Sequence, residues 1–130
     1  MRLVQDDARA KGIVDGVLHV SLAPPFVGLV TLDGESAVGA VIINNYEPRA
    51  SADVSFTGRL SPTTLRDLAR YLFNVLGVRR VQAVTRFDNI KARQGLMRLG
   101  FKYEGNLRER FEDCDGAIYG LLRRDCKFWF

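Results

Sequence analysis

The sequence predicts a mixed α/β fold built on a mostly antiparallel sheet, and three observations predict it. First, Asp33-Gly34 is a strong hairpin signal between two stretches rich in β-branched and apolar residues. Second, apolar residues recur at helical spacing over 65–76, which is typical of a helix buried on one side. Third, another helical pattern ends at Gly100 and is followed by two more strand-like stretches.

The first half of the chain contributes most of the predicted strands. We expect strands at 2–4, 26–32, 36–46 and 50–57, because each is short, apolar on alternate positions and bounded by turn residues. A short helix over 6–16 follows the first strand, although its two glycines weaken it. The prolines of Ala23-Pro24-Pro25 then predict an extended segment that interrupts regular secondary structure before the hairpin.

The second half begins with a helix that connects two strands. Ser61 suits the capping position and Pro62 suits the first helical position, so a helix is expected from Ser61 to Leu76. It is read as a crossover into a strand at 78–85.

A second helix is expected after that strand, followed by a final hairpin. Asp88 or Asn89 caps the helix, which runs to Gly100. Strands over 101–109 and 116–122 then complete the order β–α–β–β–β–α–β–α–β–β, joined by a turn containing Asp115-Gly116.

Length and composition restrict the class of protein. With 130 residues, of which 47% are hydrophobic and 26% charged, we expect one globular domain over 1–130 and exclude collagen-like and disordered classes. No apolar run reaches membrane-spanning length, so no membrane partner is expected. Two cysteines and one histidine, His19, give no metal-ligand spacing. These features favour a reduced, cytoplasmic protein that holds no metal.

Positive charge is concentrated in the centre of the chain. Residues 59–110 carry a net charge of +8, whereas 1–58 carry −3 and 111–130 carry −1. Such a segment favours anionic partners, namely phosphates, nucleic acid or an acidic protein surface. The alternative interpretation is a solvated basic helix face.

Several strings in the second half carry a resemblance to a known family. They are Leu76-Gly77-Val78-Arg79-Arg80-Val81, Asn89-Ile90-Lys91-Ala92, and the segment from Leu99-Gly100-Phe101 to Leu107-Arg108-Glu109. With these strings, residues 26–124 resemble the GNAT superfamily of N-acetyltransferases, and most closely its branch of ribosomal-protein N-acetyltransferases.

The resemblance implies a GNAT-like sheet with splayed middle strands, flanking helices and acetyl-CoA in the V-shaped opening. Pantetheine is then expected along 51–57 and the pyrophosphate at 58–64, where free amides and the positive end of a helix dipole attract anions. The implied cofactor-binding residues are Val54, Phe56, Thr57, Arg59, Leu60, Ser61, Thr63, Thr64, Asn89, Ala92 and Arg93.

The sequence departs from the family pattern at the pyrophosphate loop. The family has Arg or Gln, then Gly, then Gly or Ala at positions that here are Phe56, Arg59 and Ser61, and of these only Ser61 is small. Glycine there lets backbone approach the pyrophosphate closely. Arg59 either clasps a phosphate with its side chain or blocks the groove, so the loop is degenerate.

The catalytic groups are less clear than the cofactor site. Relatives use a tyrosine in the second helix, and the matching position here is Leu96. Asp53, on the expected cofactor strand, is the candidate base, against the alternative of an exposed strand residue. Tyr103 is the candidate acid, and Tyr119 is a further one, although core or hairpin packing is the favoured interpretation for both. His19 is expected to be a surface or packing residue and not a base.

We therefore predict an acetyl-CoA-dependent N-acetyltransferase that acts on an amine of a protein or small molecule. The helical region before Pro24 is abbreviated, so the acceptor site is reduced or completed by a partner. The alternative is a catalytically degenerate GNAT-fold protein, like some compact phage-encoded relatives, that binds a protein partner. The tail over 127–130 would cover a sheet edge or form a homodimer contact, against the alternative of a loosely packed tail. No nucleic-acid recognition module is visible, so nucleic acid is not an expected partner.

Overall fold

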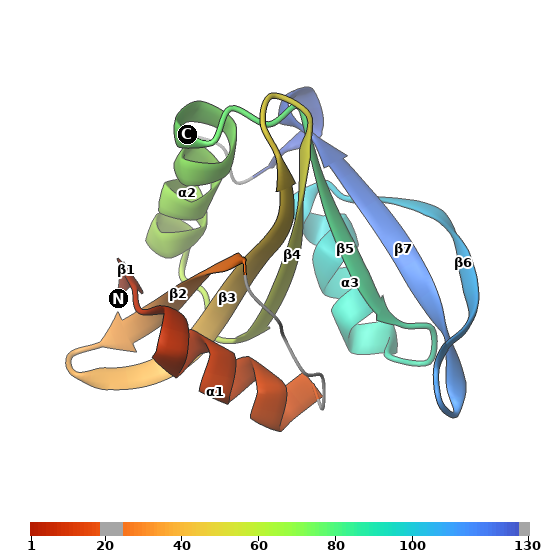
Figure 1. Ribbon diagram of the computed structural model, residues 1–130, viewed down its shortest axis with the longest axis horizontal. Coiled ribbons are helices and arrows are strands. Elements are labelled where there is room, and N and C mark those ends of the chain that lie inside the picture. Colours follow the sequence, from red (N-terminus) through yellow and green to blue (C-terminus); the bar gives the residue numbers. More distant parts are fainter. Residues whose placement is uncertain (19–24, 128–130) are drawn as a thin grey trace.

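The computed structural model describes residues 1–18 and 25–127, and the strands among them form one seven-stranded sheet in the order β1-β2-β3-β4-β5-β7-β6 (Figure 1). The parallel pairing of β4 with β5 interrupts an otherwise antiparallel ladder. This confirms the predicted element order, mixed class and crossover. In chain order the elements are β1 (Arg2–Gln5), α1 (Asp7–Leu18), β2 (Phe26–Asp33), β3 (Ser36–Glu47), β4 (Ser51–Gly58), α2 (Pro62–Arg70), a π-helical turn (Tyr71–Val75), β5 (Arg80–Arg86), α3 (Ile90–Leu99), β6 (Lys102–Phe111), β7 (Cys114–Leu122) and a 3-10 turn (Arg123–Asp125).

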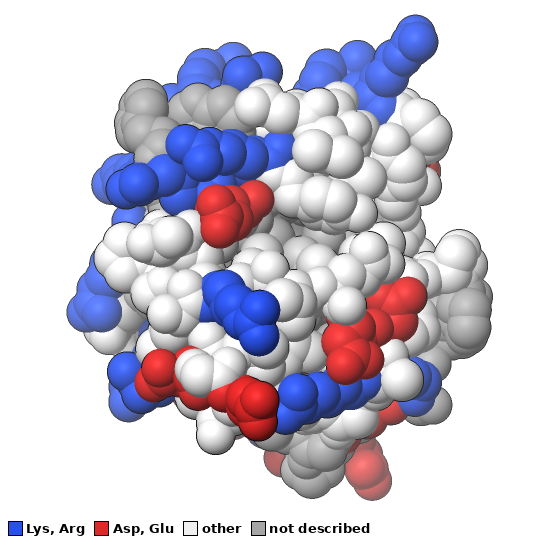
Figure 2. Space-filling model, turned by 90° about the vertical axis from the view of Figure 1, so that its left-hand side faces the viewer, with Lys and Arg blue, Asp and Glu red and all other residues white. Residues whose placement is uncertain are grey.

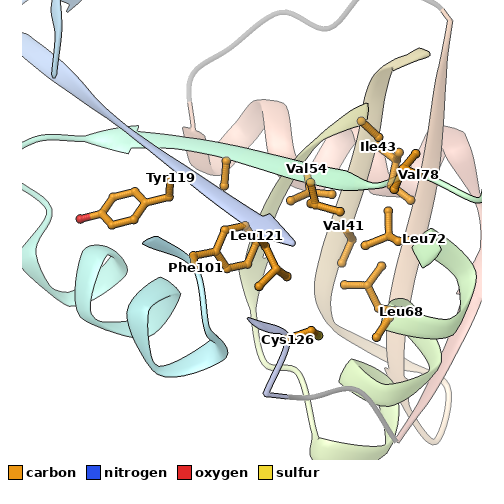
Figure 3. Close-up of a cluster of buried hydrophobic side chains, with 14 of the residues drawn as sticks. Val41, Ile43, Val54, Leu68, Leu72, Val78, Phe101, Tyr119, Leu121 and Cys126 are labelled. Atoms are coloured by element: carbon orange, nitrogen blue, oxygen red, sulfur yellow. The ribbon is translucent and has the colours of Figure 1, made fainter. Parts of the chain in front are cut away.

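Helices cover both faces of the sheet. On one face, Leu68 of α2 belongs to an apolar cluster with Val54 of β4 (Figure 3). Leu96 of α3 belongs to the same cluster. On the other face, Val14 of α1 packs in a smaller cluster with Ile42 of β3. The alternation of buried residues along each strand assigns its two faces to these two clusters.

The crossover helix differs from the single helix predicted over 61–76. The α-helical part ends at Arg70, and a π-helical turn follows in which the Leu76 N–H donates to the Tyr71 carbonyl at 2.8 Å. The Leu76 carbonyl accepts a hydrogen bond from the Tyr46 hydroxyl at 2.8 Å, which ties this turn to β3. The wider turn leaves Leu72 and Phe73 both buried.

The predicted turn at Asp115-Gly116 is wrong, because both residues lie within β7. Phe111 pairs with Cys114, so the turn is formed by Glu112 and Asp113, three residues earlier. The Asp115 carboxylate accepts a hydrogen bond from the Glu109 N–H at 2.8 Å. A Cβ at position 116 would lie 2.9 Å from the Arg110 Cβ, so the glycine permits a close side-chain crossing rather than a turn.

Three regions named from the sequence lie outside the described residues, namely His19, the stretch 23–24 and the tail 128–130. Within 1–18 and 25–127, no helix has the length and apolar character needed to span a membrane.

Candidate functional site

The two central strands part from each other shortly after they begin. Parallel β4 and β5 pair at Ser51↔Arg80, Ala52↔Val81 and Asp53↔Gln82, and then diverge (Figure 1). Beyond this point β4 continues its pairing with β3 and β5 with β7. The edge of β4 that faces β5 therefore has no partner strand from Val54 onward among the described residues. This is the splayed geometry that the resemblance to the GNAT superfamily implied.

A tightly anchored turn connects the divergent end of β4 to α2. Gly58 has a φ of +81°, and a Cβ there would lie 2.4 Å from the Val38 carbonyl oxygen. The Arg59 N–H donates to the Val38 carbonyl at 2.9 Å, and the Arg59 carbonyl accepts from the Thr31 hydroxyl at 2.9 Å. Both backbone groups of Arg59 are thus held by the neighbouring strands, while its residue surface is exposed.

Backbone donors remain available where α2 begins. Ser61 caps the helix by accepting a hydrogen bond from the Thr64 N–H at 3.2 Å. The N–H groups of Leu60, Ser61 and Thr63 have no acceptor among the described residues. Free amides at a helix start, with a cation beside them, are suited to binding a phosphate group.

The other residues predicted at this turn have structural contacts. Thr64 is fully buried, and its hydroxyl donates to the Ser61 carbonyl at 2.9 Å. Val54 is buried in the main core, and Phe56 packs against the same core. Thr57 is half-buried opposite Ala40 of β3. Val54, Phe56 and Thr57 therefore present their backbone to the opening between β4 and β5 more directly than their side chains.

The side chains at the start of α3 form hydrogen bonds within the protein. The Asn89 side-chain oxygen accepts a hydrogen bond from the Ala92 N–H at 3.1 Å, so Asn89 is the N-cap of α3. Arg93 donates from Nε to the Tyr119 hydroxyl at 2.9 Å and from a terminal nitrogen to the Phe87 carbonyl at 3.0 Å. Its guanidinium also lies 4.2 Å from the centre of the Phe87 ring.

No family model matches the sequence, and no curated protein matches it. Solved structures do match. A candidate acetyltransferase from T. thermophilus is 26% identical with a TM-score of 0.69, over 86% of this chain and 65% of that one. A mutant form of the spermidine/spermine N-acetyltransferase SpeG from Vibrio cholerae is 15% identical with a TM-score of 0.77, over 94% of each chain. The chain has the GNAT fold.

Two further acetyltransferase structures give the same result. One is 25% identical with a TM-score of 0.71, and the other is 23% identical with a TM-score of 0.67. The present chain covers 66% and 64% of their lengths, so it spans about two thirds of these GNAT proteins.

The catalytic residues predicted for the GNAT site do not come together. Asp53 is the last paired residue before β4 leaves β5, and it points away from the face that holds Val54. Tyr103 lies on β6, two strands beyond β5, and its ring packs edge-on against Tyr119 at 5.6 Å between centroids. The two groups thus lie on opposite faces and cannot act on one reacting atom.

Leu96, where the resemblance implied that relatives have a tyrosine, is buried in the core with 5% of its surface exposed. Tyr119 also lies in this core, with its hydroxyl directed away from Val54 (Figure 3). Neither residue therefore supplies a phenol to the opening between β4 and β5.

A polar cluster at the paired end of β4 and β5 was missed by the sequence analysis. The Asp53 carboxylate accepts a hydrogen bond from the Asn45 amide at 2.8 Å. Arg80 donates to Glu104 at 2.8 Å and to Gln82 at 2.9 Å, and this pairing holds the pKa of the Glu104 carboxyl below its ordinary value.

The Arg80–Glu104 pair crosses a glycine of β7. A Cβ on Gly120 would lie 2.3 Å from a guanidinium nitrogen of Arg80 and 2.4 Å from a carboxylate oxygen of Glu104. The "Tyr-Gly-Leu-Leu" string contains this glycine, but its partners are 16 and 40 residues away in sequence. Only the sheet order brings them together.

Proposed function

We propose that the chain is an acetyl-CoA-dependent N-acetyltransferase that acetylates an amine of a small molecule or a protein. The observation that carries this proposal is the divergence of β4 from β5 next to a helix start with free amides. The thioester of the cosubstrate would supply the acetyl group. The acceptors of the structural neighbours make spermidine and related amines the first ones to test.

The residues at the turn fit a diphosphate despite the missing glycines. The N–H groups of Leu60, Ser61 and Thr63 provide donors, and the exposed Arg59 side chain provides a positive charge beside them. Gly58 supplies the left-handed backbone that turns the chain here. The unpaired edge of β4 offers further backbone groups to an extended, amide-containing arm. Asn89, Ala92 and Arg93 were also expected to contact the cofactor, but we assign them to holding α3, because Asn89 bonds to Ala92 and Arg93 bonds to Tyr119.

Asp53 is the residue that we assign to proton removal from the amine. Its carboxylate lies where β4 and β5 separate, and the Asn45 amide fixes its orientation at 2.8 Å. General-base catalysis needs such a carboxylate within reach of the amine, directly or through one water. Alignment of amine and thioester supplies the rest of the rate enhancement.

Calorimetry with acetyl-CoA tests the proposal. We expect micromolar or tighter binding, which corresponds to about −8 kcal/mol or more. Arg59→Ala is expected to weaken binding at least tenfold, whereas Arg98→Ala, which removes an exposed arginine from the last turn of α3, leaves it unchanged. Tighter binding by Arg59→Ala would show that this side chain blocks the groove. Absence of binding to the unaltered chain would refute the proposal.

A second candidate function is binding of a protein partner by a GNAT fold without catalysis. The burial of Leu96 and the separation of Asp53 from Tyr103 favour it, because neither position supplies a phenol next to the candidate base. Steady release of the free thiol in the presence of an amine acceptor distinguishes the two functions. Turnover that is lost in Asp53→Asn would support the enzyme and eliminate the binding protein.

A further inference from the structure

Four large apolar side chains are exposed close to one another around α3. Phe87, Ile90, Met97 and Tyr103 have 41%, 56%, 48% and 46% of their surface exposed. They come from the segment before α3, from α3 itself and from the start of β6. Single exposed apolar side chains are ordinary on a protein surface, whereas a contiguous group marks a place where another molecule binds.

Arg93 joins the four side chains into one surface. Ile90 is three residues before Arg93 and Met97 is four residues after it, so the three side chains share one face of α3. The Arg93 guanidinium lies 4.2 Å from the centre of the Phe87 ring and 5.6 Å from the centre of the Tyr103 ring. These five residues are called the α3 surface below.

The α3 surface carries positive charge that the described residues do not neutralise. Arg93 donates hydrogen bonds to the Tyr119 hydroxyl and to the Phe87 carbonyl, neither of which has a net charge. Lys91 and Arg98 are exposed, and their spacing of seven residues places them together along one side of the same helix. Neither forms an ion pair with a described residue, and α3 contains no acidic residue.

The carboxylates that flank α3 in the sequence already have partners. Asp88 pairs with Arg86 at 3.1 Å, and Glu104 accepts a hydrogen bond from Arg80 at 2.8 Å. On the side of the molecule drawn in Figure 2, by contrast, acidic side chains lie among the basic ones. A molecule that neutralises the α3 surface must therefore supply the negative charges itself.

We propose that the α3 surface binds an acidic amphipathic helix of a protein partner. The apolar side chains of that helix would cover the exposed apolar ones, and its carboxylates would pair with Arg93 and Arg98. The distance along α3 from Ile90 to Met97 is about 10 Å, or two turns, which suits apolar residues at i, i+3 or i+4 and i+7 of the partner. Aromatic rings, a methionine and an arginine are also the residues that protein interfaces favour.

A second copy of the chain and a nucleic acid fit this surface less well. Two facing copies would place Lys91, Arg93 and Arg98 against the same three cations, and like charges oppose association. Ile90 and Met97 are aliphatic, so they favour apolar protein side chains over phosphates and sugars. An added strand is also disfavoured, because β6 at this edge has two register shifts in its pairing with β7.

Selection from a library of displayed helical peptides tests the proposal. The probe is a helix of about four turns with its outward positions randomised. We expect the recovered peptides to bind with micromolar Kd, to carry apolar residues at i, i+3 or i+4 and i+7, and to have an excess of Asp and Glu. Their affinity should fall as salt increases. Recovery of no binder, or of binders without that acidic excess, would overturn the proposal.

Variants at exposed positions then locate the bound peptide. The double variant Ile90→Ser, Met97→Ser and the single variant Arg98→Glu should each weaken peptide binding about tenfold or more. Val75→Ser and Arg9→Glu are the matched controls, because they change an exposed apolar residue and an exposed arginine on other elements, and they should bind as the unaltered chain does. An unchanged melting temperature verifies that each variant is folded. Undiminished binding by the α3 variants would refute the proposal.

Two further measurements exclude the competing partners. Sedimentation that shows a dimer of the unaltered chain, and a monomer for Ile90→Ser, Met97→Ser, would assign the surface to a second copy instead. Tighter binding of an oligouridylate than of the peptides, lost in the same variant, would assign it to nucleic acid. The surface lies three strands from β4 in the sheet, so a saturating peptide should leave acetyl-CoA binding unchanged. Loss of acetyl-CoA binding in the presence of the peptide would contradict this separation.

Discussion

The two turns that follow the central strands look alike in sequence and differ in structure. Each leads from a central strand into a helix that a side chain caps, Ser61 for α2 and Asn89 for α3. After β4, backbone donors remain free and Arg59 faces solvent. After β5, Arg93 is bound to Tyr119 and to Phe87. The first turn is thus available to a ligand, whereas the second fastens α3 to the sheet.

The largest expected effect comes from the backbone at the first turn. Gly58→Ala introduces a Cβ at a φ of +81° and 2.4 Å from a carbonyl oxygen, so we expect a loss of about 3 kcal/mol or more in unfolding free energy. Gly34→Ala is the matched control, because its φ of +65° is similar but its Cβ meets nothing within 4 Å. It should lose about 1 kcal/mol. Equal losses in urea unfolding would show that the close approach to β3 does not matter.

The next largest effect distinguishes the roles of Arg93 and Arg59, one in stability and the other in binding. Arg93→Ala leaves the buried Tyr119 hydroxyl without its partner, so we expect a loss of about 2 kcal/mol in unfolding free energy. Arg59→Ala, at an exposed position, should change stability by less than about 0.5 kcal/mol and weaken acetyl-CoA binding instead. Urea unfolding and calorimetry on both variants measure this. If Arg93→Ala lost affinity without losing stability, Arg93 would be a cofactor contact, as first predicted from the sequence.

The two caps provide a finer comparison. Ser61→Ala and Asn89→Ala each remove one side-chain acceptor from a helix start, at 3.2 and 3.1 Å, and should each cost about 1 kcal/mol. Only Ser61→Ala is expected to weaken acetyl-CoA binding as well, since the free amides lie beside it. A matching loss of affinity in Asn89→Ala would show that both helix starts contact the cofactor.

The element order was predictable because it depends on local signals, whereas the splayed strands were expected only from the resemblance to the GNAT superfamily. The Asp33-Gly34 hairpin, the Ser61 and Asn89 caps and the left-handed Gly100 each determine structure within a few residues. The Asp115-Gly116 prediction was wrong because a contact across the final hairpin, the close crossing of the Arg110 side chain, decides the use of the glycine.

The polar groups of the site were harder to predict for the same reason. The position of Asp53 on β4 was expected, but its partner Asn45 lies in an irregular part of β3 with a φ of +50°. The separation of Tyr103 from Asp53 follows from the sheet order, which places β7 between β5 and β6. Sequence spacing contains no information about that order.

The smallest expected effect is a pH dependence of stability at the second turn, which connects β5 to α3. Arg86 donates to Asp88 at 3.1 Å and to Asp113 at 2.8 Å, which joins the start of α3 to the β6–β7 turn. These hydrogen bonds hold the pKa values of both carboxyls below their ordinary value of 3.8. A lowered pKa means that the stabilisation is present above the ordinary pKa and is lost as pH falls through the lowered one.

Thermal melts at pH 7 and at about pH 3 or below, for the unaltered chain and for Arg86→Gln, isolate this contribution. At pH 7 the unaltered chain should melt at a slightly higher temperature than Arg86→Gln. This difference in melting temperature should shrink in acid, because Asp88 and Asp113 become protonated. Asp115, whose pKa is also lowered, bonds to Glu109 and Asn106 and is present in both proteins, so its titration cancels in the difference. A difference that stays constant with pH would mean that Arg86 fastens the second turn through its contact with the Phe111 ring, at 5.7 Å, and not through the carboxylates.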